Sequence, residues 1–275
     1  MPPIATVVQL LAAGARAHAS RDAIARAALA RATALTVAAA ADRWVDAALA
    51  MKGCDVSAGV AGAVAAAARS EETATGPLGT LRLLALTARA LDGVARNGVP
   101  AAAGPPRLLD PCAGGSGFVG VPVIPAAGMW DEAVFGGIGA VIRCVDPGGL
   151  AAFARSWREE AASRPAGGGV CVVLGAGNVT GLSAADVLAQ VFEHGRAALL
   201  KLHPLHAALE PVLRDALGPL VEAGLVAIVT GGADVAREAV HDPGVTHVHM
   251  TGGQGTFDAL VWGGPGPRAA GATPA

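Results

Sequence analysis

The segment from Gly169 to Gly253 repeats a strand, a loop and a helix, and this order constrains the fold more than any other feature of the sequence. Short apolar runs predict strands at 169–175, 197–202, 225–229 and 245–250. Helices are predicted between them, at 184–194 after an opening Ser183, at 205–223, and from Ala233 onward. Apolar strands that alternate with amphipathic helices are typical of a parallel sheet covered on both faces. The sequence therefore predicts an α/β fold built on a Rossmann-like open parallel sheet.

The first 99 residues are predicted to form an N-terminal helical segment packed on that sheet. Ser20 is a plausible N-cap for a helix that runs to Met51, and Gly53 is its stop signal. Two further helices are predicted at 56–68 and at 78–95, the second closed by Asn97 and Gly98. Trp44 is expected to pack inward. The arginines of the long helix are expected to line a solvated face, and they are Arg21, Arg26, Arg31 and Arg43.

Residues 100–164 are predicted to form a linker and an added strand pair. Alternating patterns indicate strands at 118–124 and 140–144, followed by a helix at 150–162. The glycine-rich run Leu108–Gly117 between the linker and the first strand resembles the cofactor loop of amino-methylating methyltransferases. That loop must lead into a helix, which Pro122 and Pro125 oppose, so a surface turn is favoured and the methyltransferase is kept as an alternative.

Bulk composition excludes several classes of function. The net charge of −2 argues against a nucleic-acid partner. The four cysteines show no CxxC spacing, which is typical of reduced thiols in a cytoplasmic protein. No basic residue precedes the apolar run 4–13, so no signal peptide is predicted. No membrane span is predicted either, because every apolar run of about 18 residues is better interpreted as an amphipathic helix. Two histidine pairs lack a third ligand, so no metal site is predicted; they are His203 with His206 and His247 with His249.

Glycines and polar residues follow the predicted strands, at the sheet edge where open α/β folds bind ligands. Gly175, Gly177 and Gly181 would let the backbone turn tightly and approach a ligand. Asn178 adds an amide donor, and Lys201 ends the second strand with a charge suited to hydroxyls or phosphate. Further along the chain, two small turns offer backbone amides near a helix start, and they are Gly231-Gly232 and Thr251-Gly252-Gly253.

The order and spacing of these residues resemble the nicotinamide-binding domain of the aldehyde dehydrogenase superfamily. Asn178 and Lys201 are 23 positions apart (201 minus 178), and the glycine turn and the Thr-Gly pair follow in sequence. The resemblance is good over 168–262 and faint over 20–98. It is closest to a bacterial branch with Gly-Ala-Gly-Asn at the first loop and Val-Trp-Gly after the last strand, which are Gly175–Asn178 and Val261–Gly263 here.

The resemblance implies NAD or NADP as cofactor and a role for each loop. Asn178 would be the catalytic amide that donates to the aldehyde oxygen, with Ala176 and Gly177 beside the cofactor, and Lys201 would bind the adenosine ribose. Gly231, Gly232 and the following helix would hold the adenine and pyrophosphate, with Thr251, Gly252 and Gly253 beside the phosphates. The sequence departs from the family in three places: Leu202-His203-Pro204 stands where Pro-Ser/Ala-Glu often follows the Lys, so the acidic ribose contact is missing, Gly253 replaces a serine, and Ala236 replaces a glycine.

The implied function is that of an aldehyde-dehydrogenase-like NAD(P)-binding protein, which in the full family oxidises an aldehyde by hydride transfer to NAD(P)+. Residues 165–262 would form the NAD(P)-binding unit and 263–275 a disordered tail. The family's catalytic Cys and Glu lie beyond the Thr-Gly turn, so the chain is expected to be truncated and unable to catalyse alone. Two alternatives stay open: an interaction or split-subunit module whose open sheet edge pairs with a second chain, and the S-adenosylmethionine-dependent methyltransferase.

Overall fold

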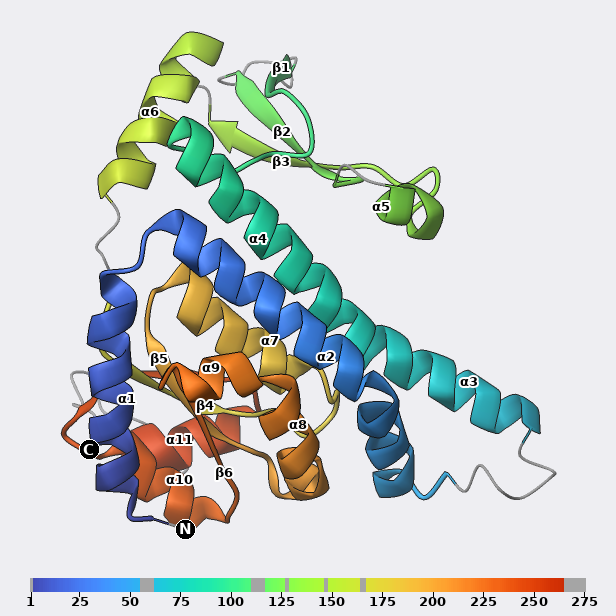
Figure 1. The fold of residues 1–275 in the computed structure, drawn as a ribbon, viewed down its shortest axis with the longest axis vertical. Coiled ribbons are helices and arrows are strands. Elements are labelled where there is room, and N and C mark those ends of the chain that lie inside the picture. The colour runs from blue at the N-terminus through green and yellow to red at the C-terminus, as the bar shows by residue number, and fades with distance from the viewer. Residues whose placement is uncertain are drawn as a thin grey trace. The chain divides into compact units, whose positions relative to one another are not determined.

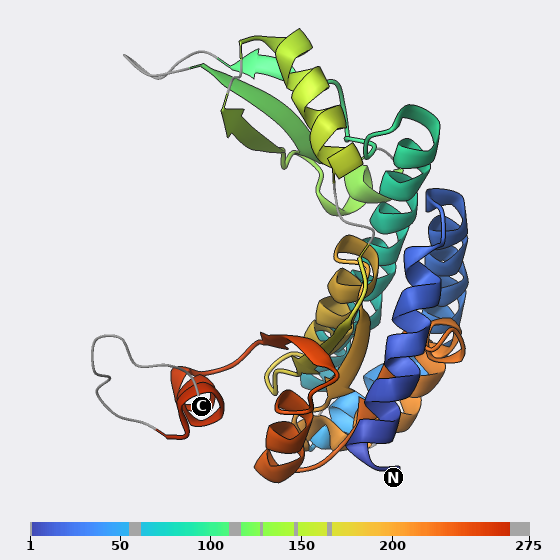
Figure 2. The same ribbon diagram turned by 90° about the vertical axis from the view of Figure 1, so that its left-hand side faces the viewer.

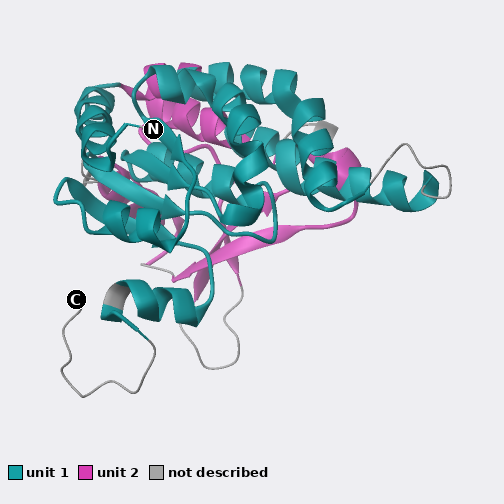
Figure 3. Cartoon of the chain, turned by 90° about the horizontal axis from the view of Figure 1, so that it is seen from below, with its two compact units in different colours: residues 1–21, 29–85, 166–275 teal, residues 22–28, 86–165 magenta. Residues whose placement is uncertain are grey.

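The computed structural model describes residues 2–54, 62–109, 117–126, 129–145, 148–163 and 167–264 (Figure 1). The chain divides into two compact units (Figure 3). Unit 1 contains 1–21, 29–85 and 166–275, and unit 2 contains 22–28 and 86–165. Two helices carry residues of both units, α2 (Ala23–Met51) and α4 (Gly79–Asn97). Unit 1 thus combines most of the predicted N-terminal helical segment with the predicted NAD(P)-binding segment.

Unit 1 is built on a parallel four-stranded sheet of order β6-β5-β4-β7. The strands are β4 (Val170–Leu174), β5 (Ala197–Lys201), β6 (Val226–Val229) and β7 (Val245–Met250). The predicted parallel sheet is therefore confirmed. Every residue of β4 and β5 is buried, which is typical of the central strands of a parallel sheet, and Lys201 at the end of β5 is the one charged residue among them. The expectation that both faces are covered is wrong for the edge strand β7, where Thr246, His247 and Val248 are exposed.

The helices between these strands differ in detail from those predicted. The helix predicted to open at Ser183 is α7 (Leu182–Leu188) with Gly181 at its N-cap, and it continues as a π-helical turn, η3 (Ala189–Glu193). The helix predicted over 205–223 is divided into three pieces, because Pro211 and Pro219 each begin a new helix. These pieces are the 3-10 helix η4 (Pro204–Leu209), α8 (Glu210–Ala216) and α9 (Gly218–Glu222).

The last two helices of the described chain lie before and after β7 in sequence. The helix predicted from Ala233 is α10 (Ala233–Val240), which is confirmed. A further helix, α11 (Gln254–Trp262), follows β7 and was not predicted. The predicted tail lies outside the described residues from position 265 onward.

The N-terminal segment is helical, as predicted, but its first boundary is wrong. The chain begins with α1 (Ile4–Ala19), and Ser20 ends that helix instead of starting the next. Asp22 provides the cap of α2, because its Oδ1 accepts a hydrogen bond of 2.7 Å from the backbone N–H of Ala25. Downstream lie α3 (Gly62–Thr73), a π-helical turn η2 (Ala74–Leu78) and α4; the start of the helix predicted at 56–68 falls outside the described residues.

Helix α2 is the one described helix whose length and apolar composition would permit a membrane span. Trp44 is fully buried in unit 1, as predicted, and Val45 and Leu49 are buried with it. The predicted solvated arginine face is only partly correct: Arg31 and Arg43 are exposed, whereas Arg21 and Arg26 are half-buried. Burial thus explains only part of the apolar composition of this helix, because Ile24 and Leu35 are exposed.

Helix α1 completes the core of unit 1 by packing along β4, β5 and β6 (Figure 2). Its buried side chains include Ile4, Val8 and Leu11. At its carboxyl end the buried His18 donates from Nε2 to the carbonyl oxygen of Val191, 3.1 Å away. The core that supports the sheet therefore depends on a helix that is distant in sequence, since His18 and Val191 are 173 positions apart.

Unit 2 contains an antiparallel sheet of order β1-β2-β3. Strands β2 (Phe118–Ile124) and β3 (Ala140–Val145) confirm the predicted strand pair, and β1 (Arg107–Leu109) is an unpredicted third strand. Helices α5 (Met129–Val134) and α6 (Leu150–Ser163) complete the unit. The glycine-rich run at 110–116 lies outside the described residues, but the chain emerges from it as a strand and not as the helix that the methyltransferase alternative requires.

Candidate functional site

A cleft of about 880 Å³ lies at the carboxyl ends of β4, β5 and β7, within unit 1. Parallel strands present their carboxyl ends at one edge, so residues far apart in sequence meet there. Seven of the nine residues predicted to contact the cofactor line this cleft, namely Ala176, Gly177, Asn178, Lys201, Thr251, Gly252 and Gly253. Gly231 and Gly232 are not among its lining residues.

The loop after β4 presents Asn178 to the cleft. The backbone N–H of Gly175 donates to the carbonyl oxygen of Lys201 at 3.0 Å, which ties the start of this loop to the end of β5. A Cβ atom on Gly175 would lie 2.5 Å from Ser183 Oγ, so a larger residue there would have to displace the buried Ser183 side chain. Asn178 itself is exposed, and its amide has no hydrogen-bond partner among the described residues. That amide is available to a ligand.

Lys201 places a buried cation in the cleft. Its side chain is 7 % exposed, and the described part of the chain offers its ammonium no hydrogen bond or salt bridge. Burial lowers the pKa of Lys201 below its ordinary value, and the negative charge of Asp234 raises it in part. A buried ammonium is costly unless it is paired. A ligand that brings phosphate or ribose oxygens to this position would supply the missing partner.

The Gly231-Gly232 turn leads into α10, as the resemblance predicts, but the first turn of this helix carries an acid. Gly231 has φ of 147°, and Gly232 is the N-cap residue of α10. Asp234 lies in the first turn, where its carboxylate already interacts favourably with the positive helix end. It therefore competes with any pyrophosphate for that position. The next turn supplies Arg237, which lines the cleft.

The hydroxyl of Thr251 is engaged by a residue that sequence patterns did not single out. Thr251 Oγ1 donates to Asp186 Oδ2 at 2.9 Å. The other oxygen of that carboxylate lies 3.2 Å from His249 Nε2. The Thr251 hydroxyl can thus accept a hydrogen bond from a ligand, but its proton is already donated to Asp186. Asp186 lies on α7, and nothing in its local sequence distinguishes it from an ordinary helical aspartate.

The cleft lining combines basic nitrogens with an absence of acids. Lys201, His203 and Arg237 line it, and no Asp or Glu is present among the described lining residues. His203 Nδ1 accepts a hydrogen bond of 3.2 Å from the backbone N–H of Leu205, and its ring closes over Gly177. Since Nδ1 is the acceptor, Nε2 carries the proton of the neutral imidazole. This lining suits an anionic ligand.

The described thiols are poor candidates for a nucleophile. Cys171 is buried inside β4, and burial raises its pKa to about 11. Cys54 and Cys144 are half-buried and lie outside the cleft lining, and Cys112 falls outside the described residues. Across the described ranges, no three His, Cys, Asp or Glu side chains gather in a metal-binding group.

No protein-family model matches the sequence, and no curated protein matches it. Among solved structures, the chain is similar to proline utilization A (PutA) with proline bound in remote sites, with a TM-score of 0.51 and 14 % identity over 94 % of this chain and 20 % of that chain. It also matches 3,6-anhydro-L-galactose dehydrogenase in complex with NAP, with a TM-score of 0.49 and 15 % identity over 92 % of this chain and 40 % of that chain.

The chain thus spans a fifth of the first structure and two fifths of the second. At these identities the similarity shows the fold alone. The similarity to part of proline utilization A supports the aldehyde-dehydrogenase-like fold that the sequence indicates.

Proposed function

We propose that the cleft of unit 1 binds a nicotinamide dinucleotide, NAD or NADP, and that the chain is an aldehyde-dehydrogenase-like cofactor-binding protein. The observation that carries this proposal is the convergence of Asn178, Lys201 and the Thr251–Gly253 turn on one cleft. Its volume of about 880 Å³ falls in the range of roughly 300–1,000 Å³ that is usual for cofactor sites.

The residues present fit such a ligand on two counts. The buried ammonium of Lys201 lacks a protein partner within the described chain, and the lining holds basic nitrogens without carboxylates. Lys201 would bind ribose or phosphate oxygens, and the free amide of Asn178 would donate to the carbonyl oxygen of a substrate or nicotinamide. A bound dinucleotide supplies hydride acceptance, and the chain's own residues would hold and orient it.

Catalysis by this chain alone is not part of the proposal. The family chemistry needs an activated thiol, but none of the described cysteines lines the cleft, and burial raises the pKa of Cys171 to about 11. We therefore propose that aldehyde oxidation requires residues other than the described cysteines of this chain.

Isothermal titration calorimetry with NAD+ and NADP+ tests the proposal. We expect one of the two dinucleotides to bind. We expect Lys201→Ala to raise the dissociation constant of that dinucleotide several-fold, because the ammonium contact is lost. Arg158→Ala is the matched control, since Arg158 is an exposed cation on α6 and is not among the residues that line the cleft. Equal dissociation constants for the wild-type protein and Lys201→Ala would refute the role of Lys201. Binding of S-adenosylmethionine in place of either dinucleotide would favour the methyltransferase.

A further inference from the structure

A buried carboxylate lies behind the loop that carries Asn178. Glu72 is in the last turn of α3 and is 2 % exposed. Its Oε1 lies 2.5 Å from the ammonium of Lys52, and its Oε2 accepts a hydrogen bond of 2.9 Å from Thr180 Oγ1. Both oxygens of this buried acid are therefore used, as a buried charge requires.

Thr180 connects this acid to the cleft. It is 3 % exposed and lies two positions after Asn178, in the loop between β4 and α7. Its hydroxyl is the only side-chain group of the described loop residues 175–181 with a hydrogen bond to α3. Glu72 itself is absent from the cleft lining, so any effect on a ligand must pass through the loop.

The π-helical turn η2 brings the two segments into backbone contact. A Cβ atom on Gly181 would lie 2.1 Å from the carbonyl oxygen of Thr75 and 3.1 Å from Gly76 Cα. A Cβ atom on Gly76 would lie 3.2 Å from Thr180 Oγ1. Two glycines thus allow η2 to press directly against the end of the loop. Single π-helical turns are costly to maintain and occur frequently at functional sites.

We propose that Glu72 is a positioning residue for the nicotinamide end of the cleft: by holding the hydroxyl of Thr180 against η2, it fixes the loop that presents Asn178. This inference rests on the proposed function, in which Asn178 serves the nicotinamide end and Lys201 the adenosine end of the ligand. It assigns a role to a residue that is distant in sequence from the cleft-lining loop, since Glu72 and Thr180 are 108 positions apart.

Glu71 provides a matched control on the same helix. It also contacts Lys52, at 3.3 Å, but its side chain is 64 % exposed and it makes no contact with Thr180. Glu71→Gln therefore alters the charge around Lys52 without touching the loop. Glu72→Met removes the acid at similar volume, Thr180→Val removes the hydroxyl alone, and Thr180→Ser retains it.

The decisive measurement is calorimetric binding of NAD+ (or NADP+, whichever the wild type prefers) compared with ADP-ribose, which lacks the nicotinamide. We expect Glu72→Met and Thr180→Val each to weaken dinucleotide binding about fivefold, the scale of one hydrogen bond, and to leave ADP-ribose binding within about twofold. Their double variant should be no weaker than either, since both break the same bond. Thr180→Ser and Glu71→Gln should match the wild type. Equal losses for both ligands, or additive losses in the double variant, would overturn the inference.

Amide hydrogen exchange in the ligand-free full chain separates this inference from the proposed function. We expect faster exchange across 176–181 in Glu72→Met and Thr180→Val, and unchanged exchange there in Glu71→Gln. If the wild type binds no dinucleotide, the proposed function fails, yet faster loop exchange would still support the positioning of the loop by Glu72. Unchanged exchange across 176–181 in both variants would overturn it whatever the ligand.

Discussion

Lys201 illustrates how a single side chain can oppose the stability of the fold that carries it. The last residue of β5 is a cation that is 7 % exposed, in a strand that is otherwise Ala and Leu. An apolar side chain would pack there without any desolvation cost. Residues that lower stability at such a position are characteristic of binding sites, where activity and stability conflict.

The pH dependence of stability follows from this burial. Because the folded-state pKa of Lys201 is lowered below that of the unfolded chain, the folded state binds fewer protons and stability rises with pH through that interval. The cost of burial is therefore fully present below the lowered folded-state pKa and is relieved as pH rises from that pKa to the pKa of the unfolded chain. We expect Lys201→Met to stabilise the ligand-free protein by roughly 0.5–1 kcal/mol at pH 7, with a smaller gain at pH 9.5. Urea unfolding at the two pH values measures the difference; a variant less stable than wild type at pH 7 would contradict it.

Site residues could be predicted from the sequence only where topology alone brings them together. Asn178 and Lys201 follow neighbouring parallel strands, so the strand pattern was sufficient to place both on one cleft. Asp186 and Glu72 could not be found in this way, because each reaches the site from a helix through one hydrogen bond. Such contacts depend on the orientation of a helix, which local sequence does not determine.

At the scale of elements, the strands were easier to predict than the helices. The buried strands are short apolar runs with glycine or proline near their ends, and these signals survive in an alanine-rich chain. Helix boundaries were less well predicted because alanine suits any helix face, which removes the contrast that marks an amphipathic stripe. The division of 205–223 follows from Pro211 and Pro219, which lack the backbone N–H that an unbroken helix needs and therefore lie at the starts of α8 and α9.

The contact of α1 with the turn after α9 depends on a residue without a side chain. A Cβ atom on Gly14 would lie 2.0 Å from the carbonyl oxygen of Gly224, which is backbone and cannot rotate away. Glycine in a helix interior otherwise costs up to about 1 kcal/mol relative to alanine. Close packing is therefore the reason for glycine at this position.

We expect Gly14→Ala to destabilise the protein by about 1–3 kcal/mol, because the overpacking exceeds the gain in helix propensity. Gly218→Ala is the control, since a Cβ at Gly218 meets nothing within 4 Å at the start of α9; its stability should stay within about 0.5 kcal/mol of wild type or rise slightly. Chemical denaturation of both variants gives the answer, and a stabilising Gly14→Ala would show that α1 does not pack closely on this turn.

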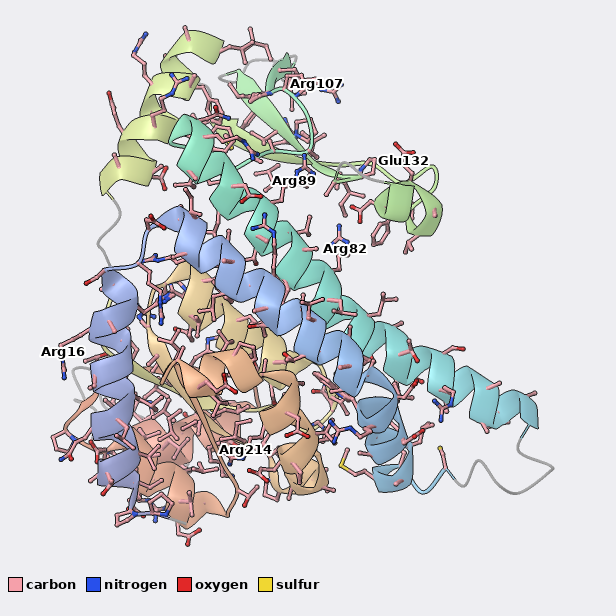
Figure 4. All side chains as sticks on the ribbon, viewed as in Figure 1. Arg16, Arg82, Arg89, Arg107, Glu132 and Arg214 are labelled. Carbon is pink, nitrogen blue, oxygen red and sulfur yellow. The ribbon has the colours of Figure 1, made fainter. Side chains whose placement is uncertain are left out.

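On the scale of the whole molecule, the cleft-bearing unit is discontinuous in sequence. Unit 1 needs 1–21 and 29–85 as well as 166–275, and side chains of α1 and α2 fill its core. Edges of the sheet are also stabilised from outside the strands: Arg214 of α8 (Figure 4) donates to the carbonyl oxygen of Ile228 on the edge strand β6. The sequence pattern indicated where the sheet lies, but not which distant helices it requires.

We therefore expect the isolated segment 166–275 not to fold cooperatively, although it contains the entire parallel sheet. Without Ile4, Val8 and Leu11 of α1, which packs on β4 and β5, part of the buried surface of these strands would be exposed to water. Circular dichroism during urea titration of this fragment, next to the full chain, tests the expectation. A sigmoidal transition with the full chain's midpoint would show that the sheet folds without α1 and α2.

Because of the π-helical turn at 74–78, the position of the loop at the cleft depends on the number of residues in this segment as well as on their identity. An i→i+5 turn contains one more residue than the α turn it replaces. Loss of Pro77, the proline inside this turn, would let α3 and α4 join in α-helical register, and every side chain before the junction would rotate by about 100° relative to those after it. The Glu72 side chain would then face away from the loop that it now holds, although no side chain of that loop had changed.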